Sequence, residues 1–181
     1  QARTPARSHT ETLRHLAPEV DLIVTTGGVS VGEEDHVHHA VRNAGGKIVV
    51  AGAAIKPGKP ITVGHIGKTM LIGLPGNPVS AFVTWTVFGR TILDKLAGMT
   101  PPRAQRRHVV TGHALYHRPG RCELRPANIT GHDPHGHEIV SAGEATHSAR
   151  LAPLLAADGL LVIPAEATQI AKGEILEFLP L

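Results

Sequence analysis

The 181-residue chain is 41% hydrophobic and 18% charged, a composition typical of globular proteins and unlike that of disordered chains. Aromatic residues make up only 3%, so we do not expect the exposed rings on which single-stranded nucleic acids stack. The formal charge is +3 with basic residues spread along the chain, which favours a solvated surface and no nucleic-acid partner.

Helices and strands alternate from the beginning of the chain. Ser8 and Glu11 have the capping-box spacing of a helix that ends before Pro18. Residues 21–26 (DLIVTT) predict a strand covered on both faces, because no polar residue alternates after the first. Residues 34–44 predict an amphipathic helix.

The same alternation continues to about residue 100. Residues 47–51 predict a strand, and residues 61–64 and 69–74 predict a hairpin. Residues 78–97 predict a long, largely buried helix with Asn77 at its N-cap. This succession predicts an α/β sheet with helices packed on its faces.

A change of composition at residues 99–107 (MTPPRAQRR) indicates a linker. Short β-rich segments follow, interrupted by one helix at about residues 149–156. We therefore expect two domains, an α/β domain at residues 1–100 and a small β-barrel or sandwich at residues 101–181.

Rare residue types indicate the compartment. Cys122 is the single cysteine, which excludes an internal disulfide and fits a reducing compartment. No apolar run approaches the ~20 residues that span a bilayer, and residues 1–10 have no apolar core like that of a signal peptide. We expect a cytoplasmic protein with no membrane partner.

Three loops have the chemistry of an anion site, and we call them the first, second and third loop: TTGGVSVGEED (25–35), GLPGNPVS (73–80) and IKPGKP (55–60). Glycines let the backbone approach a ligand, and Lys56 and Lys59 in a Pro-Gly turn without acids are typical of an oxyanion clamp. Tight strand-to-helix turns also need glycine, so the first loop alone fits either role. Neither a P-loop nor a Gly-x-Gly-x-x-Gly motif is present, so a standard nucleotide-binding fold is not supported.

Other polar residues have simpler interpretations. His132, His135 and His137 could bind a metal, but a solvated histidine-rich turn is favoured because no cysteine and few acids accompany them. Cys122 is interpreted as a packed thiol, since nothing pairs it with a base. Ser148 fits the N-cap of the short helix.

The segments TTGGVSVGEED, AIKPGKP and GLPGNPVSAFVTW, followed by GRCEL, ATHSARL and ADGLLVIP, resemble the molybdopterin molybdenumtransferases. The E domain of gephyrin is a relative of that family. The resemblance covers nearly all of the chain. It implies a three-layer α/β molybdopterin-binding domain, incomplete at its N-terminus, followed by a small β-barrel. It also implies the reaction: adenylylated molybdopterin and molybdate give AMP and the molybdenum cofactor, with Mg²⁺.

The resemblance implies roles for individual residues. It implies that molybdopterin is bound by Thr26, Gly27, Gly28, Ser30, Gly32, Pro75, Gly76, Asn77 and Pro78. It implies that molybdate is bound by Lys56, Lys59, Ser80, Arg121 and Ser148, with Arg125 as the alternative to Arg121. The catalytic residues are Asp35, Lys56 and Lys59, and Asp35 is also the expected magnesium ligand.

The chain also departs from the family pattern. Family members are roughly twice as long, Thr4 and Pro5 stand where they usually have an acidic pair, and Gly52 replaces a lysine. A non-catalytic module that binds molybdopterin or its cofactor therefore stays open, as does a scaffold. The adenylyltransferase with the same α/β fold is disfavoured by the KPGKP loop and attached barrel. Expected partners are the pterin, molybdate, a second copy of the chain through an exposed apolar edge, and the molybdopterin adenylyltransferase.

Overall fold

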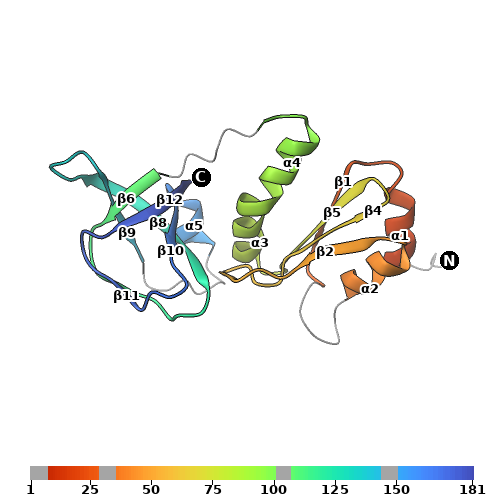
Figure 1. Ribbon diagram of the computed structural model, residues 1–181, viewed down its shortest axis with the longest axis horizontal. Helices are drawn as coiled ribbons and strands as arrows, with labels where there is room; N and C mark the ends of the chain where they lie inside the picture. Colours follow the sequence, from red (N-terminus) through yellow and green to blue (C-terminus); the bar gives the residue numbers. More distant parts are fainter. Residues whose placement is uncertain (1–7, 29–35, 101–106, 144–150) are drawn as a thin grey trace, which may run out of the picture.

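The structure is a computed structural model that describes residues 8–28, 36–100, 107–143 and 151–181. Figure 1 shows the order of its parts: a barrel, the helices α3 and α4, a sheet, and the helices α1 and α2 on the far side of that sheet. The sheet and these four helices form the first domain.

The sheet of the first domain has four strands in the order β1-β5-β4-β2. Their bounds are β1 (Leu22–Thr26), β2 (Lys47–Ala51), β4 (Thr62–Ile66) and β5 (Thr69–Leu74). β1 and β5 are parallel, whereas β4 pairs antiparallel with both β5 and β2. The predicted hairpin is confirmed, and Gly67 and Lys68 form its turn.

Helices cover both faces of this sheet, which confirms the three-layer α/β fold. On one face, α1 (His9–Leu16) and α2 (His36–Asn43) enclose an apolar cluster made up of Leu13, Ile23, Val37, Ala40, Val41, Ile66 and Leu71. On the other face lies the helical segment that starts with α3 (Pro78–Thr84). It packs Ala81, Trp85, Phe88 and Ile92 against Ile61, Ile72 and Leu74.

Local capping signals are confirmed at two helices. The Glu11 amide donates to Ser8 Oγ at 3.3 Å, and the Ser8 amide donates to Glu11 Oε2 at 3.0 Å, which completes the capping box. At α3, the Ser80 amide donates to Asn77 Oδ1 at 3.2 Å. Both caps bind amides that lack a partner within the helix.

Two predictions about burial were wrong. β1 is not covered on both faces, because it is an edge strand and Val24 is 44% exposed. The exposed side chains of Val20 and Val24 give this edge of the sheet the apolar character that was expected. The long helix continues from α3 through a π-helical segment, Trp85–Gly89, into α4 (Arg90–Leu96), where no side chain is fully buried. The buried side chains of α3 lie in the first half of this helical segment, whereas those of α4 are exposed or, like Ile92, only partly buried.

The second domain is a closed barrel of five strands, which confirms a barrel and excludes a sandwich. The strands are β6 (Arg107–Thr111), β8 (Cys122–His132), β9 (Glu138–Ala142), β10 (Gly159–Ile163) and β12 (Ile175–Pro180). Their order is β10-β12-β6-β9-β8, and pairing between β10 and β8 closes the circle. Val109, Leu161 and Phe178 are fully buried in its core.

Smaller elements complete the structure. β7 (Leu115–Tyr116) pairs with β11 (Gln169–Ile170) beside the barrel, and α5 (Ala152–Leu155) lies within the predicted helical region. β3 (Ile55–Lys56), which the sequence did not predict, pairs in parallel with β8 of the barrel.

The two domains share a packed seam. Val79 and Val83 of α3 share an apolar cluster with Leu124 and Leu160 of the barrel and Leu154 of α5. With the β3–β8 pairing, this seam fixes the loop after β3 against the barrel. Within the described residues, no helix is long and apolar enough to cross a membrane.

Candidate functional site

The first two glycine loops meet at the carboxyl ends of β1 and β5. These strands are parallel neighbours, and the Gly27 amide donates to Leu74 O at 2.9 Å. Gly27 and Gly28 have φ values of 80° and 68°, which favour glycine. A Cβ on Gly76 would lie 3.4 Å from Gly27 Cα. The structure therefore places the predicted pterin loops side by side, with bare backbone where they touch.

The second loop leads directly into α3. Asn77 caps the helix, Pro78 occupies its first turn, and Ser80 is buried. The Ser80 hydroxyl lies 3.5 Å from Asn77 Oδ1. The backbone carbonyl of Ser80 accepts a hydrogen bond from Thr84 Oγ1 at 2.6 Å. Ser80 is therefore held within the cap of the helix at the candidate site.

The third loop packs on the same helix. Gly58 has a φ of 116°, and a Cβ placed there would lie 2.5 Å from Thr84 Oγ1. The amides of Ala53 and Ile61 both donate to Lys59 O, at 2.9 and 3.0 Å, and close the loop on itself. Because Thr84 lies one turn after Ser80, α3 brings the second and third loops to one end of the domain.

Lys56 reaches into a buried charge cluster of the barrel. Its Nζ lies 3.7 Å from Glu123 Oε2, and the lysine side chain is 31% exposed. Arg125 donates to both oxygens of Glu123, at 3.2 and 3.0 Å, and both side chains are buried. His117 Nε2 also lies 3.7 Å from Glu123 Oε2. Lys59, by contrast, is exposed.

Both candidate arginines lie at this third loop. Arg121 is exposed and donates from Nη1 to Ile55 O at 3.4 Å, and the adjacent Cys122 amide donates to Ala54 O. Arg125 is engaged with Glu123 and also donates to Tyr116 O at 3.0 Å. The geometry brings Lys56, Arg121 and Arg125 together without choosing between the two arginines.

Sequence reasoning missed Glu123 and His117. Glu123 and Arg125 are two residues apart, so on a strand their side chains lie on one face. An acid and a base at that spacing give a weak signal of pairing. For His117 the sequence gives no signal, because the residues that hold it, Ala167 and Thr168, lie about fifty positions further along the chain.

Several predicted residues lie outside the described residues, namely Ser30, Gly32, Asp35 and Ser148. Among the described residues, no group of three or more His, Cys, Asp or Glu side chains could hold a metal ion. The described part of the chain therefore does not fit a magnesium site.

The histidine-rich turn is organised by its own aspartate. Asp133 accepts bonds of 2.8 to 2.9 Å from the amides of His135 and His137 and from His137 Nδ1. Desolvation by burial raises the pKa of Asp133, but these bonds outweigh it and lower that pKa to about 2. The interpretation as a turn, rather than a metal site, accounts for these contacts.

Cys122 does not have the surroundings of an activated thiol. Burial raises its pKa, and three nearby carboxylates, on Glu177, Glu166 and Glu123, raise it further. The thiolate is therefore disfavoured, as expected for a packed cysteine.

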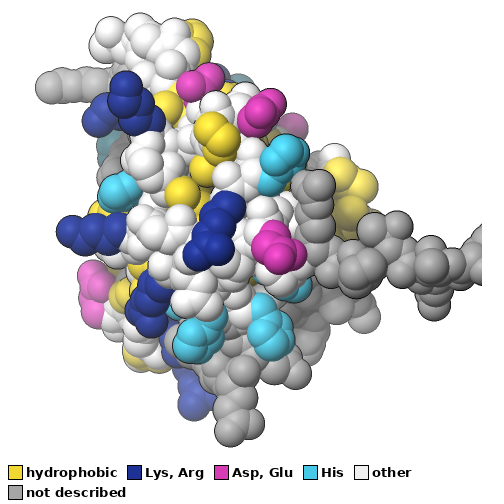
Figure 2. Space-filling view, turned by 90° about the vertical axis from the view of Figure 1, so that its right-hand side faces the viewer, with side chains coloured by type: hydrophobic (Ala, Val, Ile, Leu, Met, Phe, Trp, Pro, Cys, Tyr) yellow, Lys and Arg dark blue, Asp and Glu magenta, His cyan; other side chains and the backbone are white. Residues whose placement is uncertain are grey.

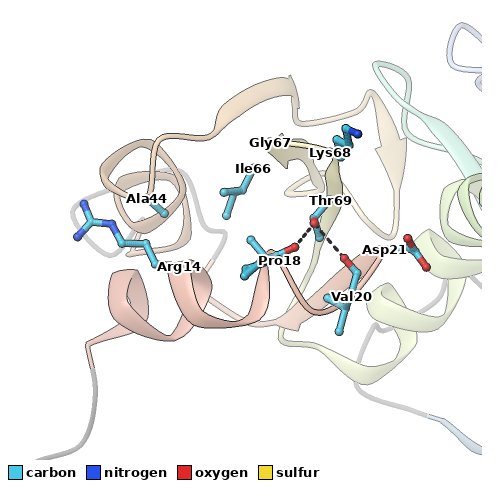
Figure 3. A pocket seen from close by; sticks show the side chains of 10 residues that line it. Arg14, Pro18, Val20, Asp21, Ala44, Ile66, Gly67, Lys68 and Thr69 are labelled. Atoms are coloured by element: carbon cyan, nitrogen blue, oxygen red, sulfur yellow. Dashed lines mark hydrogen bonds between the residues drawn. The ribbon is translucent and has the colours of Figure 1, made fainter.

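A cavity of about 530 Å³ lies at the other end of the sheet (Figure 3). Its lining comes from α1, the start of β1 and the β4–β5 turn, and includes Arg14, Asp21 and Lys68. Thr69 in its wall donates to the carbonyls of Ala17 and Val20. Figure 2 shows that basic, acidic and histidine side chains are interspersed over this end of the molecule. The cavity lies at the amino ends of β1 and β5, so it is separate from the candidate site.

Two family models match the chain. A probable molybdopterin-binding domain matches residues 6–95, and the C-terminal region of MoeA, its domain IV, matches residues 108–181. The first match contains all three glycine loops. The second contains the barrel strands and the charge cluster around Glu123.

Curated relatives match along nearly the whole chain. Molybdopterin molybdenumtransferase 2 of Mycobacterium tuberculosis is 35% identical over 171 residues, which are 91% of this chain and 41% of that protein. Molybdopterin molybdenumtransferase of a Nostoc species is 31% identical over 170 residues, or 91% and 38% of the two chains. The chain thus spans about two fifths of the length of these relatives.

A solved structure shows the same fold. The molybdopterin biosynthesis MoeA protein of Pyrococcus horikoshii superposes with a TM-score of 0.70 at 23% identity, covering 94% of this chain and 41% of its own. A molybdenum cofactor biosynthesis protein of Pyrococcus furiosus gives a TM-score of 0.68 at 21% identity, covering 94% and 53%. With both family models matched in one chain and curated relatives aligned across it, the chain belongs to the MoeA-type family of molybdopterin molybdenumtransferases.

Proposed function

We propose that this chain supplies the molybdopterin- and molybdate-binding part of a molybdenum-insertion enzyme of molybdenum cofactor biosynthesis. The observation that carries the proposal is the convergence of the three loops. Gly27 and Gly76 touch, α3 connects their loop to the KPGKP loop, and that loop presents Lys56 beside the barrel arginines. The proposed domains are residues 1–100 and 101–181.

The glycine loops are proposed to hold the pterin. A Cβ on Gly76 would lie 3.4 Å from Gly27 Cα and one on Gly28 would lie 3.3 Å from Val37 Cγ2, so the missing side chains let the two loops meet, and the pterin is proposed to lie against this bare backbone. Pro75 and Pro78 stiffen the second loop, which lowers the entropy lost when a ligand orders it. The other proposed pterin residues are Thr26, Asn77, Ser30 and Gly32, of which the last two lie outside the described residues.

The third loop and the barrel are proposed to hold molybdate, the second substrate. Lys56 and Lys59 carry charge on a loop closed by its own hydrogen bonds, so the cost of arranging them is met before the anion binds. Ser80 and either Arg121 or Arg125 complete the described part of this set, and Ser148 is its proposed member outside the described residues. Transfer of molybdenum to the dithiolene would release AMP.

Magnesium remains a proposal for Asp35, outside the described residues. The described residues do not fit this ion, so the roles assigned to the chain are binding and orienting the two substrates. We also propose a cytoplasmic homodimer that receives its pterin from the molybdopterin adenylyltransferase. The free thiol of Cys122 fits a reducing compartment, and the apolar edge at Val24 could be covered by a second copy.

The test is to mix the purified chain with adenylylated molybdopterin, molybdate and magnesium, and to follow AMP release and bound pterin together. Lys56→Ala and Asp35→Ala are the test variants. Lys68→Ala is the matched control, because Lys68 is an exposed lysine of the β4–β5 turn at the other end of the sheet.

AMP release that falls in the two test variants and not in the control supports insertion activity. Pterin bound without AMP release would instead indicate the non-catalytic binding module. A wild-type chain that neither releases AMP nor binds the pterin would contradict the proposal. AMP release by Arg121→Met and Arg125→Met, followed in the same assay as the molybdate concentration is varied, assigns the role of the arginine.

A further inference from the structure

One buried carboxylate connects the third loop to the barrel. Glu123 is 0% exposed and lies on β8, directly opposite Lys56 in the β3–β8 pairing. Its two oxygens accept from Arg125 Nε at 3.2 Å and Arg125 Nη2 at 3.0 Å. This two-bond geometry fixes the orientation of the carboxylate as well as its position.

Two further basic groups face the same oxygen. Lys56 Nζ and His117 Nε2 each lie 3.7 Å from Glu123 Oε2, at ion-pair distance. His117 Nδ1 lies 2.9 Å from Ala167 O, and because a carbonyl only accepts, Nδ1 carries the proton. Nε2 is therefore left facing Glu123, buried and without a hydrogen-bond partner.

The charges of this cluster do not cancel. Glu123 contributes one negative charge, while Arg125 and Lys56 contribute two positive charges even with His117 neutral. Arg125 takes up the carboxylate through direct hydrogen bonds, and Lys56 stands farther off and is partly exposed. Glu123 can therefore fix the position of the lysine ammonium while leaving its charge available to an anion that arrives from solvent.

A buried ion pair is also a costly way to fill the seam between two domains. Apolar side chains of similar volume are often as stabilising as a buried salt bridge, or more so. The neighbouring seam is built in that way, from Val79, Val83 and Leu124. The carboxylate is therefore explained better by a requirement for its charge than by packing.

We propose that Glu123 is a positioning residue, which holds Lys56 against the barrel and keeps the loop of residues 53–61 in its oxyanion-binding geometry. The carboxylate acts through the lysine and does not touch the oxyanion itself. This role rests on the proposed function, because it presumes that Lys56 binds molybdate.

The test compares three variants of the full chain. Glu123→Gln removes the charge at constant shape, and Glu123→Asp keeps the charge on a shorter side chain. Glu138→Gln is the matched control, because Glu138 on β9 makes an exposed ion pair, 3.4 Å long, with Arg107 on β6. Two quantities are measured: molybdate affinity by calorimetry, and hydrogen exchange of the Ala53 and Ile61 amides, which close the loop.

We expect Glu123→Gln to weaken molybdate binding and to speed exchange at both amides, each by about tenfold, the scale of one lost charge-assisted contact. Glu123→Asp should recover part of both effects, and Glu138→Gln should change neither. A folded Glu123→Gln chain with wild-type exchange and wild-type molybdate affinity would overturn the role of Glu123.

Two further measurements distinguish a failure of the proposed function from a failure of the role of Glu123. Wild-type chain that does not bind molybdate overturns the proposed function, whatever the exchange data show. If Glu123→Gln does not fold, Lys56→Met tests the same contact from the other side, because it leaves the bonds between Glu123 and Arg125 intact. Faster exchange at Ala53 and Ile61 in Lys56→Met supports the contact, and unchanged exchange overturns it.

Discussion

At Gly58 of the KPGKP loop, a single added methyl group should be strongly destabilising. Its φ of 116° lies in a region that side chains rarely adopt, and its Cβ would lie 2.5 Å from Thr84 Oγ1 and 3.0 Å from Ile55 Cδ1. Gly58→Ala therefore combines backbone strain of about 1–2 kcal/mol with overpacking of about 1–3 kcal/mol. We expect a loss of about 2–5 kcal/mol in the free energy of unfolding.

The assay is urea unfolding followed by circular dichroism, with Gly67→Ala as the matched control. Gly67 also has a positive φ, 58°, but no atom lies within 4 Å of its Cβ position. The control should therefore show backbone strain alone, and the difference between the two variants isolates the contact with Thr84.

A second substitution tests the same contact. Thr84→Ala removes the hydroxyl that the new methyl group would meet, so Gly58→Ala should cost less in the Thr84→Ala background by about 1–3 kcal/mol. Two results would refute the packing of this loop on α3. One is that Gly58→Ala destabilises the chain no more than Gly67→Ala does. The other is that the effects of Gly58→Ala and Thr84→Ala add in the double variant to within about 0.5 kcal/mol.

Three other residues give simpler predictions. Ser8→Ala should lower the free energy of unfolding by about 1 kcal/mol, whereas Ser8→Asp, which keeps a capping oxygen, should not. Cys122 should react with iodoacetamide more slowly than free cysteine at pH 8, because its pKa is raised, and unfolding in urea should abolish the difference. The pKa of Asp133 is lowered, so the stability it contributes is present above the ordinary value of 3.8 and is lost as the pH falls through about 2. Its carboxyl carbon should titrate near 2 by NMR, and His137→Ala should move the midpoint toward 3.8; a wild-type midpoint already near 3.8 contradicts the hydrogen-bonded turn.

Features that depend on a few neighbouring residues were predictable from the sequence. The capping box of Ser8, the cap at Asn77 and the hairpin after residue 60 each form within one short segment. The barrel strands were predictable too, because short β-rich segments bounded by turn residues mark them in the sequence. In these cases the interaction and its signal occupy the same stretch of chain.

Features that depend on distant partners were not predictable. Residues 21–26 look like a covered central strand, but the sheet order places β1 at an edge, so Val24 is exposed. β3 has only two residues, and its partner Cys122 lies far along the chain. Nothing near Ile55 or Lys56 could have indicated that pairing.

The KPGKP loop shows how this limit affects the site itself. In the sequence Lys56 and Lys59 are equivalent, because each precedes a proline in the same turn. In the structure they differ, since Lys56 lies opposite Glu123 in strand pairing with the barrel, while Lys59 is exposed and closes the loop through its carbonyl. The barrel thus distinguishes two lysines that the α/β domain presents alike. A binding site built on this loop should therefore need both domains, even though the sequence motif lies wholly in one.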